Sequence, residues 1–229
     1  FAEQTYKFGF RGITAGDWLK DICINQYNMQ ADSFSFSYDK DLYTPKTKKD
    51  NIKRVFFYAR PVTPRRDFEL GLLALNELSK RIPDLEVIFA GWDVSTYEIP
   101  FKHQNLGIMK IEELSELYGK CDLCLVISNT NLSLLPLEVM ASGSVAVCSK
   151  GANSEWLVNE DNSILVSYDP IEIADTMYTY MSDSIKLDNI RKKGIEFAQN
   201  TSWDVEGKKV LKAILKGIEE DEKCINNRG

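Results

Sequence analysis

The chain has 229 residues with 28 basic and 34 acidic side chains, which gives a formal net charge of −6. This length allows one large or two small domains with a sizeable buried core. Hydrophobic residues make up 44% and charged residues 27%, which excludes disorder, collagen and a long coiled coil for most of the chain. The acidic balance argues against a nucleic-acid partner, and no apolar run approaches the ~18 residues that span a bilayer.

The cysteine and histidine content points away from disulfide, redox or metal chemistry. Five cysteines are scattered over a chain too long for a disulfide-stapled mini-domain, so reduced thiols in a cytoplasmic protein are the simplest interpretation. Cys121 and Cys124 spell C-x-x-C, but Cys124 falls inside the apolar run 123–127 and is expected to be buried in a strand. His103 is the single histidine, so a His-based metal site or triad would have no second imidazole.

Apolar periodicity predicts short strands that alternate with helices. A helix over 16–28, an alternating strand over 33–38 and a polar loop over 44–51 come first. Apolar runs farther along the chain predict strands at 54–59, 85–90, 123–127, 145–148 and 164–166. Helices are predicted at 67–81, 111–119 and 136–143, and from Pro170, Leu187 and Thr201. This order predicts an α/β fold, a parallel sheet of about six strands with helices on both faces, which binds ligands at the carboxyl ends of its strands.

Three arginines follow the strand 54–59, in the segment Arg60-Pro61-Val62-Thr63-Pro64-Arg65-Arg66. Two prolines stiffen this loop, and each guanidinium can bind two oxygens at once, which suits a phosphate or diphosphate. Arg60 and Arg65 are expected to converge on one anion that faces the N-terminus of the helix beginning near Pro136. Arg66 is expected to contribute much less, because in an extended loop its side chain points away from that of Arg65. The alternative is a solvated cationic turn.

A polar loop at 128–136 follows the strand 123–127 and leads into the helix that opens at Pro136. The positive end of a helix dipole beside a polar loop suits an anion. Glu138 lies in the first turn of this helix, where a carboxylate either caps the helix or accepts hydrogen bonds from ligand hydroxyls. Neither G-x-G-x-x-G after the first strand nor G-x-x-x-x-G-K-[ST] anywhere is present, which weighs against nicotinamide, flavin and P-loop chemistry.

Taken in order, these motifs resemble the carboxy-terminal domain of GT-B glycosyltransferases of the retaining, metal-independent, family 4-like class. The matching pieces are Tyr58-Ala59-Arg60 with Arg65, Gly107 with Glu112-Glu113-Leu114 and Tyr118, the strand from Asp122 to Ser128, and Leu137-Glu138-Val139-Met140-Ala141-Ser142-Gly143. Residues 59–71 are similar to the rhamnosyltransferase branch of polysaccharide synthesis, and the resemblance covers roughly residues 10–215. The sequence departs from the family at Thr130, where a glutamate that contacts the donor sugar usually stands.

The resemblance implies a nucleotide-diphospho-sugar as donor substrate, with no metal and no cofactor. The implied donor-binding residues are Arg60, Arg65, Gly107, Met109, Asn131, Ser133, Leu134 and Glu138. Among them, the arginines and the backbone near Ser133 would meet the diphosphate, Glu138 the ribose, and the loop at 107–109 the base. No catalytic residue is assigned within the chain itself.

The resemblance also divides the chain into three parts. Residues 1–45 would be the end of an amino-terminal domain and a hinge, 46–200 a Rossmann-like nucleotide-sugar domain, and 201–229 a carboxy-terminal helix and tail. A glycan acceptor would bind the missing amino-terminal domain, so we expect the fragment alone to be inactive and the full-length protein to associate peripherally with a membrane. The alternative is a non-catalytic α/β binding or scaffold module derived from such a domain, a hypothesis that Thr130 supports.

Overall fold

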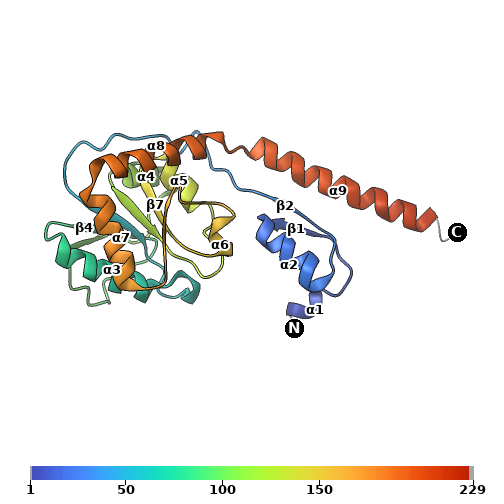
Figure 1. Ribbon diagram of the computed structural model, residues 1–229, viewed down its shortest axis with the longest axis horizontal. Helices are drawn as coiled ribbons and strands as arrows, with labels where there is room; N and C mark the ends of the chain where they lie inside the picture. Colours follow the sequence, from blue (N-terminus) through green and yellow to red (C-terminus); the bar gives the residue numbers. More distant parts are fainter. Residues whose placement is uncertain (1, 227–229) are drawn as a thin grey trace. The chain divides into compact units, whose positions relative to one another are not determined.

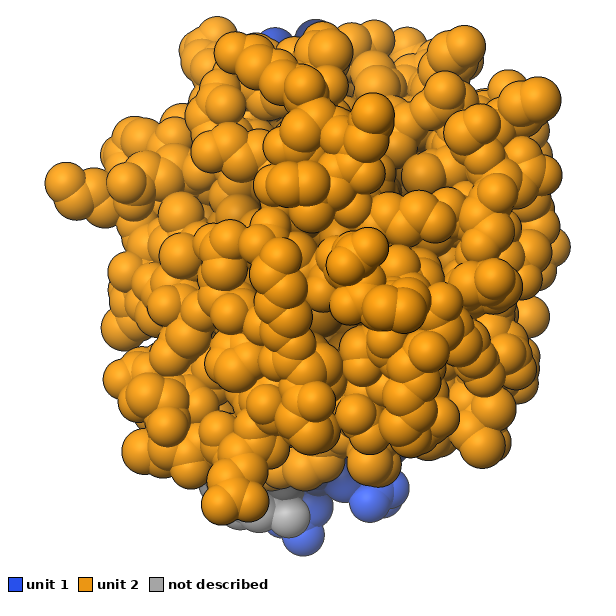
Figure 2. All heavy atoms as spheres, turned by 90° about the vertical axis from the view of Figure 1, so that its left-hand side faces the viewer, with its two compact units in different colours: residues 1–37, 201–229 blue, residues 38–200 orange. Residues whose placement is uncertain are grey.

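The computed structural model describes residues 2–226 of the chain. Contacts divide the chain into two compact units, residues 38–200 and residues 1–37 with 201–229, which Figure 2 shows in different colours. The domain boundaries expected from the sequence, after residues 45 and 200, stay predictions, because these units are defined by compactness alone. Residues 227–229 of the expected tail lie outside the described residues.

The larger unit is built on a six-stranded parallel sheet (Figure 1). Its strands are β3 (Arg54–Tyr58), β4 (Glu86–Ala90), β5 (His103–Asn105), β6 (Leu123–Val126), β7 (Val145–Ser149) and β8 (Ile164–Val166). Their spatial order is β5-β4-β3-β6-β7-β8, the doubly wound arrangement of Rossmann-like folds. Five of the six strands coincide with the apolar runs of the sequence, because both faces of a covered parallel sheet are buried.

Helices cover both faces of this sheet, as the sequence predicts. Helices α3 (Phe68–Arg81) and α7 (Pro170–Ser182) pack on one face, and their apolar residues share a core with alternate strand residues such as Val55 and Phe57. Helices α4 (Ile111–Gly119) and α5 (Leu135–Ala141) pack on the other face, where Phe56 contacts Tyr118 at 5.2 Å between ring centroids. Helix α8 (Ser184–Asn200) packs against α5 and α7, and α6 (Ala152–Glu155) follows β7.

The described cysteines behave as core residues. Cys23, Cys121, Cys124 and Cys148 are buried and free, and the side chain of Cys224 lies outside the described residues. Cys124 lies within β6, and its thiol contacts the Ser144 hydroxyl at 3.4 Å. The C-x-x-C pair is therefore part of the packing between the sheet and the α4–α5 layer. Within the described part of the chain, no helix is long and apolar enough to cross a membrane.

We predict that Gly71→Ala strongly destabilises the larger unit, because α3 packs directly on the sheet at this position. A Cβ atom at residue 71 would lie 2.1 Å from Cζ of Phe57, whose ring is fully buried. We expect a loss of about 2–3 kcal/mol in the free energy of unfolding, measured by urea denaturation. Leu73→Ala in the same helix is the control, since Leu73 is exposed and its truncation should cost about 0.5 kcal/mol or less.

The smaller unit contains a two-stranded parallel sheet, β1 (Gly12–Ala15) and β2 (Ala31–Phe34), joined by α2 (Asp17–Tyr27). The short helix α1 (Ala2–Thr5) precedes it and α9 (Trp203–Asn226) packs against β2. The strand predicted at 33–38 ends at Phe34, and this part of the prediction is wrong. The Ser35 N–H group donates instead to the Glu206 carboxylate of α9, at 2.6 Å.

Candidate functional site

The sheet order itself places the candidate site. Strands β3 and β6 are neighbours in the middle of the sheet, and the chain winds outward from them in opposite directions. At such a switch point the loops that follow the two strands diverge and leave room for a ligand. The two loops are residues 59–67, which carry the three arginines, and residues 127–134, which lead into α5.

Three hydrogen bonds join these two loops. The Asn129 N–H group donates to the Arg65 carbonyl oxygen at 2.9 Å, and the Asn129 side-chain amide donates to Asp67 Oδ1 at 2.8 Å. The Arg65 guanidinium donates from Nη1 to Thr130 Oγ1 at 3.1 Å. Thr130, which stands where the resemblance implies a glutamate, is therefore a partner of Arg65, and the arginine loop is held against the polar loop as one surface.

Arg66 occupies a different position from the one that an extended loop predicts. Residues Pro64–Arg66 form a 3-10 turn that ends at Asp67 in a left-handed conformation with φ of 45°. Arg66 is consequently turned into the protein, where it is only 8% exposed and its Nη1 has no hydrogen-bond partner. Burial and the charges of Arg65 and Arg60 lower the pKa of Arg66. The loop is a tight turn and not the extended segment that the sequence suggested, so that premise is wrong, whereas the smaller part in binding expected of Arg66 stays a prediction.

Arg60 and Arg66 lie against the same aromatic ring. Cζ of Arg60 is 5.8 Å and Cζ of Arg66 5.9 Å from the centroid of Tyr58, the last residue of β3. Arg65 is exposed, whereas Arg60 is half-buried. The structure thus brings three guanidinium groups to one end of the sheet, and sequence reasoning selected only two of them. The inward position of Arg66 could have been predicted from the sequence, since Pro64 favours a turn at this point.

The second loop has its own internal hydrogen bonds. Ser133 adopts a left-handed conformation with φ of 55°, and its N–H group donates to Asn131 Oδ1 at 3.1 Å. Its hydroxyl donates to the Leu132 carbonyl oxygen at 2.6 Å. Leu134 directly precedes α5. The structure therefore brings Asn131, Ser133 and Leu134 together at the start of α5, with the Ser133 N–H group engaged by Asn131.

Glu138 lies in the first turn of α5, near Tyr43 and Tyr118. Burial raises the pKa of its carboxyl group to about 7, and the nearby Tyr43 hydroxyl acts in the opposite direction. The Glu138 charge adds to burial in raising the pKa of Tyr43 and of Tyr118, whose rings stack 6.2 Å apart. Glu138 is thus a half-buried carboxyl group with a raised pKa, in the helix that follows the polar loop.

The loop predicted to meet the base lies beyond the edge strand β5. The Gly91 N–H group donates to the Gly107 carbonyl oxygen at 2.7 Å, and the Gly107 N–H group donates to Asn105 Oδ1 at 3.3 Å. Gly107 has a φ of 60°, and a Cβ atom there would meet nothing within 4 Å. Met109 is half-buried, and its neighbour Ile108 is 84% exposed. Gly107 and Met109 therefore follow β5 at the carboxyl end of the sheet, on the far side of β4 from the arginines.

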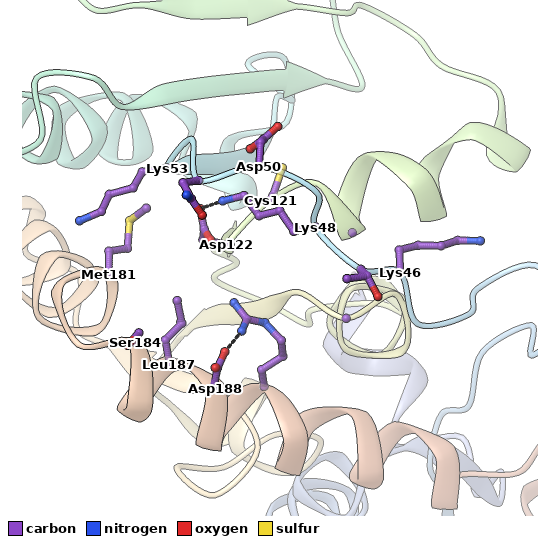
Figure 3. A pocket seen from close by; sticks show the side chains of 15 residues that line it. Lys46, Lys48, Asp50, Lys53, Cys121, Asp122, Met181, Ser184, Leu187 and Asp188 are labelled. Atoms are coloured by element: carbon purple, nitrogen blue, oxygen red, sulfur yellow. Dashed lines mark hydrogen bonds and ion pairs between the residues drawn. The ribbon is translucent and has the colours of Figure 1, made fainter.

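A separate cavity of about 470 Å³ lies at the opposite, amino-terminal end of the sheet (Figure 3). Its acidic side chains are engaged in ion pairs. Asp122 accepts from Lys48 Nζ at 2.5 Å and from the Arg54 N–H group at 2.8 Å, and Asp188 pairs with Arg191. Because its acids already have partners and the arginine loop is at the other end of the strands, we do not assign function to this cavity.

The residues that the structure describes contain no cluster of three or more His, Cys, Asp or Glu side chains able to hold a metal ion. The chain has one Asp-x-Asp pair, Asp39 and Asp41. Asp39 Oδ1 accepts from the N–H groups of Asp41 and Leu42 at 3.0 and 3.1 Å, so Asp39 stabilises a local turn. His103 is exposed in β5, and its Nδ1 lies 2.9 Å from the Phe101 carbonyl oxygen.

The solved structures that are similar to this chain include proteins named as glycosyltransferases. Sucrose-phosphate synthase from Thermosynechococcus elongatus is similar over 98% of this chain and 61% of its own, with a TM-score of 0.72 and 15% identity. HepE from Anabaena, solved with UDP and glucose, is similar over 89% of this chain and 62% of its own, with a TM-score of 0.72 and 16% identity. These similarities, with the observed sheet and helix layers, define the class: a Rossmann-like domain of the GT-B glycosyltransferase fold.

A protein-family model places the chain in a more specific group than this fold class. Residues 53–178, more than half of the chain, match the family model described as WsaF, C-terminal domain, and the chain belongs to this family. A curated relative, the O-antigen biosynthesis protein RfbC of Myxococcus xanthus, is 33% identical over 221 residues, which are 93% of this chain. The chain spans 17% of the length of that relative.

Proposed function

We propose that the chain is the donor-binding part of a glycosyltransferase in polysaccharide biosynthesis and that it binds a nucleotide-diphospho-sugar at the arginine loop. The observation that carries this proposal is the buried guanidinium of Arg66, which has an unpartnered Nη1 beside Arg60 and Arg65 at the switch point of the sheet. A concentration of positive charge without a carboxylate partner suits a multiply charged anion. HepE, which shares the fold, was solved with UDP and glucose.

The proposed chemistry requires no metal. When the bond from the sugar to the diphosphate breaks, negative charge accumulates on the leaving diphosphate, and fixed guanidinium groups stabilise that charge. Arg60, Arg65 and Arg66 would perform this role, with the backbone at Ser133 and Leu134 nearby. Glu138 would accept hydrogen bonds from the ribose hydroxyls, and the backbone of the loop 107–109 would meet the base. Retention of configuration at the sugar is part of this proposal.

The sugar, acceptor and compartment are proposed from resemblance. Residues 59–71 are similar to rhamnosyltransferases, which supports rhamnose as the transferred sugar. The relative from Myxococcus xanthus is named for O-antigen biosynthesis, which supports a glycan acceptor. The acceptor would bind a domain outside this chain, in the cytoplasm, with peripheral attachment of the whole protein to a membrane.

Calorimetric titration of the 229-residue chain with nucleoside diphosphates and with inorganic pyrophosphate tests donor binding. We expect at least one nucleoside diphosphate to bind, with the same affinity in the presence and absence of EDTA, because arginines rather than a divalent ion neutralise the diphosphate. Binding that disappears in EDTA would contradict the metal-free arrangement. The absence of binding by every member of the panel would overturn the donor site.

Thr130 favours a second candidate function. Its hydroxyl is occupied by Arg65, and no carboxylate stands at this position, which supports a non-catalytic scaffold derived from a transferase domain. The calorimetric titration described above distinguishes the two functions, because only the transferase requires nucleotide binding. A chain that binds nucleoside diphosphates is therefore assigned to the donor-binding function.

A further inference from the structure

The side chain of Tyr58 has a fixed position at the end of β3. Tyr58 pairs in register with Ala90 of the neighbouring strand, and the next residue of that strand's loop is Gly91. A Cβ atom at Gly91 would lie 2.4 Å from Cε2 and 2.8 Å from Cδ2 of the Tyr58 ring. The ring therefore packs directly on the Gly91 backbone, and this contact depends on the absence of a side chain at residue 91.

Two guanidinium groups lie beside this ring. Cζ of Arg60 lies 5.8 Å and Cζ of Arg66 5.9 Å from the ring centroid, within the distance at which an aromatic face attracts a cation. Burial and the charges of Arg65 and Arg60 lower the pKa of Arg66, and no carboxylate is among the causes. Repulsion between the arginines would separate them, whereas attraction to one shared ring keeps two of them together.

We propose that Tyr58 is a positioning residue, whose ring holds Arg60 and Arg66 in place for the diphosphate of the donor. This inference rests on the proposed donor-binding function and adds a residue to it. A carboxylate in the same place would also hold the arginines, but it would occupy their N–H groups and cancel their charge. An aromatic ring attracts the cation through its π electrons and leaves N–H donors free for phosphate oxygens.

The proposal distinguishes two properties of Tyr58, its ring and its hydroxyl group. Tyr58→Phe keeps the ring and should leave the affinity for pyrophosphate within about threefold of the wild type. Tyr58→Leu removes the ring and should weaken pyrophosphate binding by about tenfold, which corresponds to about 1.4 kcal/mol. Tyr178→Leu is the matched control, since Tyr178 is a 40% exposed tyrosine of α7. The affinity of this variant for pyrophosphate should equal that of the wild type.

A double-mutant cycle separates positioning from a general loosening of the loop. In an Arg66→Met background, Tyr58→Leu should weaken pyrophosphate binding by less than about threefold, because one of the two groups that the ring holds is gone. An equal loss in both backgrounds would overturn the proposal. Urea denaturation of each variant verifies folding, and Tyr58→Met, which keeps most of the volume without the ring, replaces Tyr58→Leu if the latter does not fold.

Failure of the donor-binding function and failure of the positioning role of Tyr58 give different experimental results. Wild-type protein that binds neither pyrophosphate nor any nucleoside diphosphate overturns the donor-binding function, and the role of Tyr58 with it. Wild-type binding combined with equal affinities of Tyr58→Leu and Tyr58→Phe overturns the positioning role alone. Loss of binding in Tyr58→Phe would assign the effect to the hydroxyl group and would also overturn positioning by the ring.

Discussion

Replacing Arg66 by methionine is expected to stabilise the free chain and to weaken pyrophosphate binding at least tenfold. Arg66 is only 8% exposed, and its Nη1 has no partner. A buried charge without a counter-ion lowers stability, and an apolar side chain of similar length removes that cost, so the free energy of unfolding should rise by roughly 1 kcal/mol. The variant also loses at least one hydrogen bond from a charged donor to phosphate, worth about 1.5–3 kcal/mol.

Arg65→Met is the comparison variant for stability. Arg65 is exposed and donates to Thr130 at 3.1 Å, so its replacement should change the free energy of unfolding by about 0.5 kcal/mol or less. Urea denaturation and calorimetry with pyrophosphate on the two variants measure both effects. An Arg66→Met protein that is less stable and binds pyrophosphate normally would show that Arg66 only packs the loop. The extended-loop hypothesis ranks Arg65 above Arg66 for binding, and the same pair of variants tests that order.

The arginine loop shows which part of a site a sequence pattern can predict. The presence of several guanidinium groups after β3 followed from residue types and from the place of the strand, since ligands meet the carboxyl ends of parallel strands. The direction of each side chain depends on backbone dihedrals that this pattern leaves open. A 3-10 turn at Pro64–Arg66, closed by Asp67 with φ of 45°, turns Arg66 inward. An extended chain would have placed it outside.

The same distinction explains which strands were predicted. The central strands are apolar because helices cover both of their faces, so their residue types indicate that they are buried. Strand β5 (His103–Asn105) is exposed along its whole length at the edge of the sheet, so it has no apolar run to detect. The alternating segment 33–38 continues the pattern of β2 beyond Phe34, but the Glu206 carboxylate takes the next N–H group, that of Ser35. A contact across 171 residues cannot be seen in a local pattern.

Glu138→Gln is expected to change how nucleotide affinity depends on pH. Burial raises the pKa of Glu138 from 4.5 to about 7, so about half of the free molecules hold a neutral carboxyl group at pH 7. Ribose hydroxyls form stronger hydrogen bonds with a carboxylate than with its protonated form. Wild-type affinity for a nucleoside diphosphate should therefore rise up to about tenfold between pH 6 and pH 8. Glutamine is neutral throughout, so this component should vanish in the variant.

Inorganic pyrophosphate is the control ligand for this titration, because it has no ribose. Phosphate groups also titrate near pH 6, but this affects wild type and variant alike. The ratio of the two affinities should change with pH for the nucleoside diphosphate and stay constant for pyrophosphate. A ratio that is constant for both ligands would remove Glu138 from the ribose contact.

The same carboxyl group should make stability fall as pH rises, the reverse of an ion-paired carboxylate. Folded Glu138 keeps its proton up to about pH 7, whereas the unfolded chain loses it near pH 4.5, so unfolding releases a proton in this interval. A pKa raised this far corresponds to roughly 3 kcal/mol at most, which partial solvent access reduces to about 1–2 kcal/mol. In urea denaturation, Glu138→Gln should match the wild type at pH 5 and exceed it by about 1–2 kcal/mol at pH 8. Equal stability at both pH values would contradict a buried carboxyl group that titrates near neutrality.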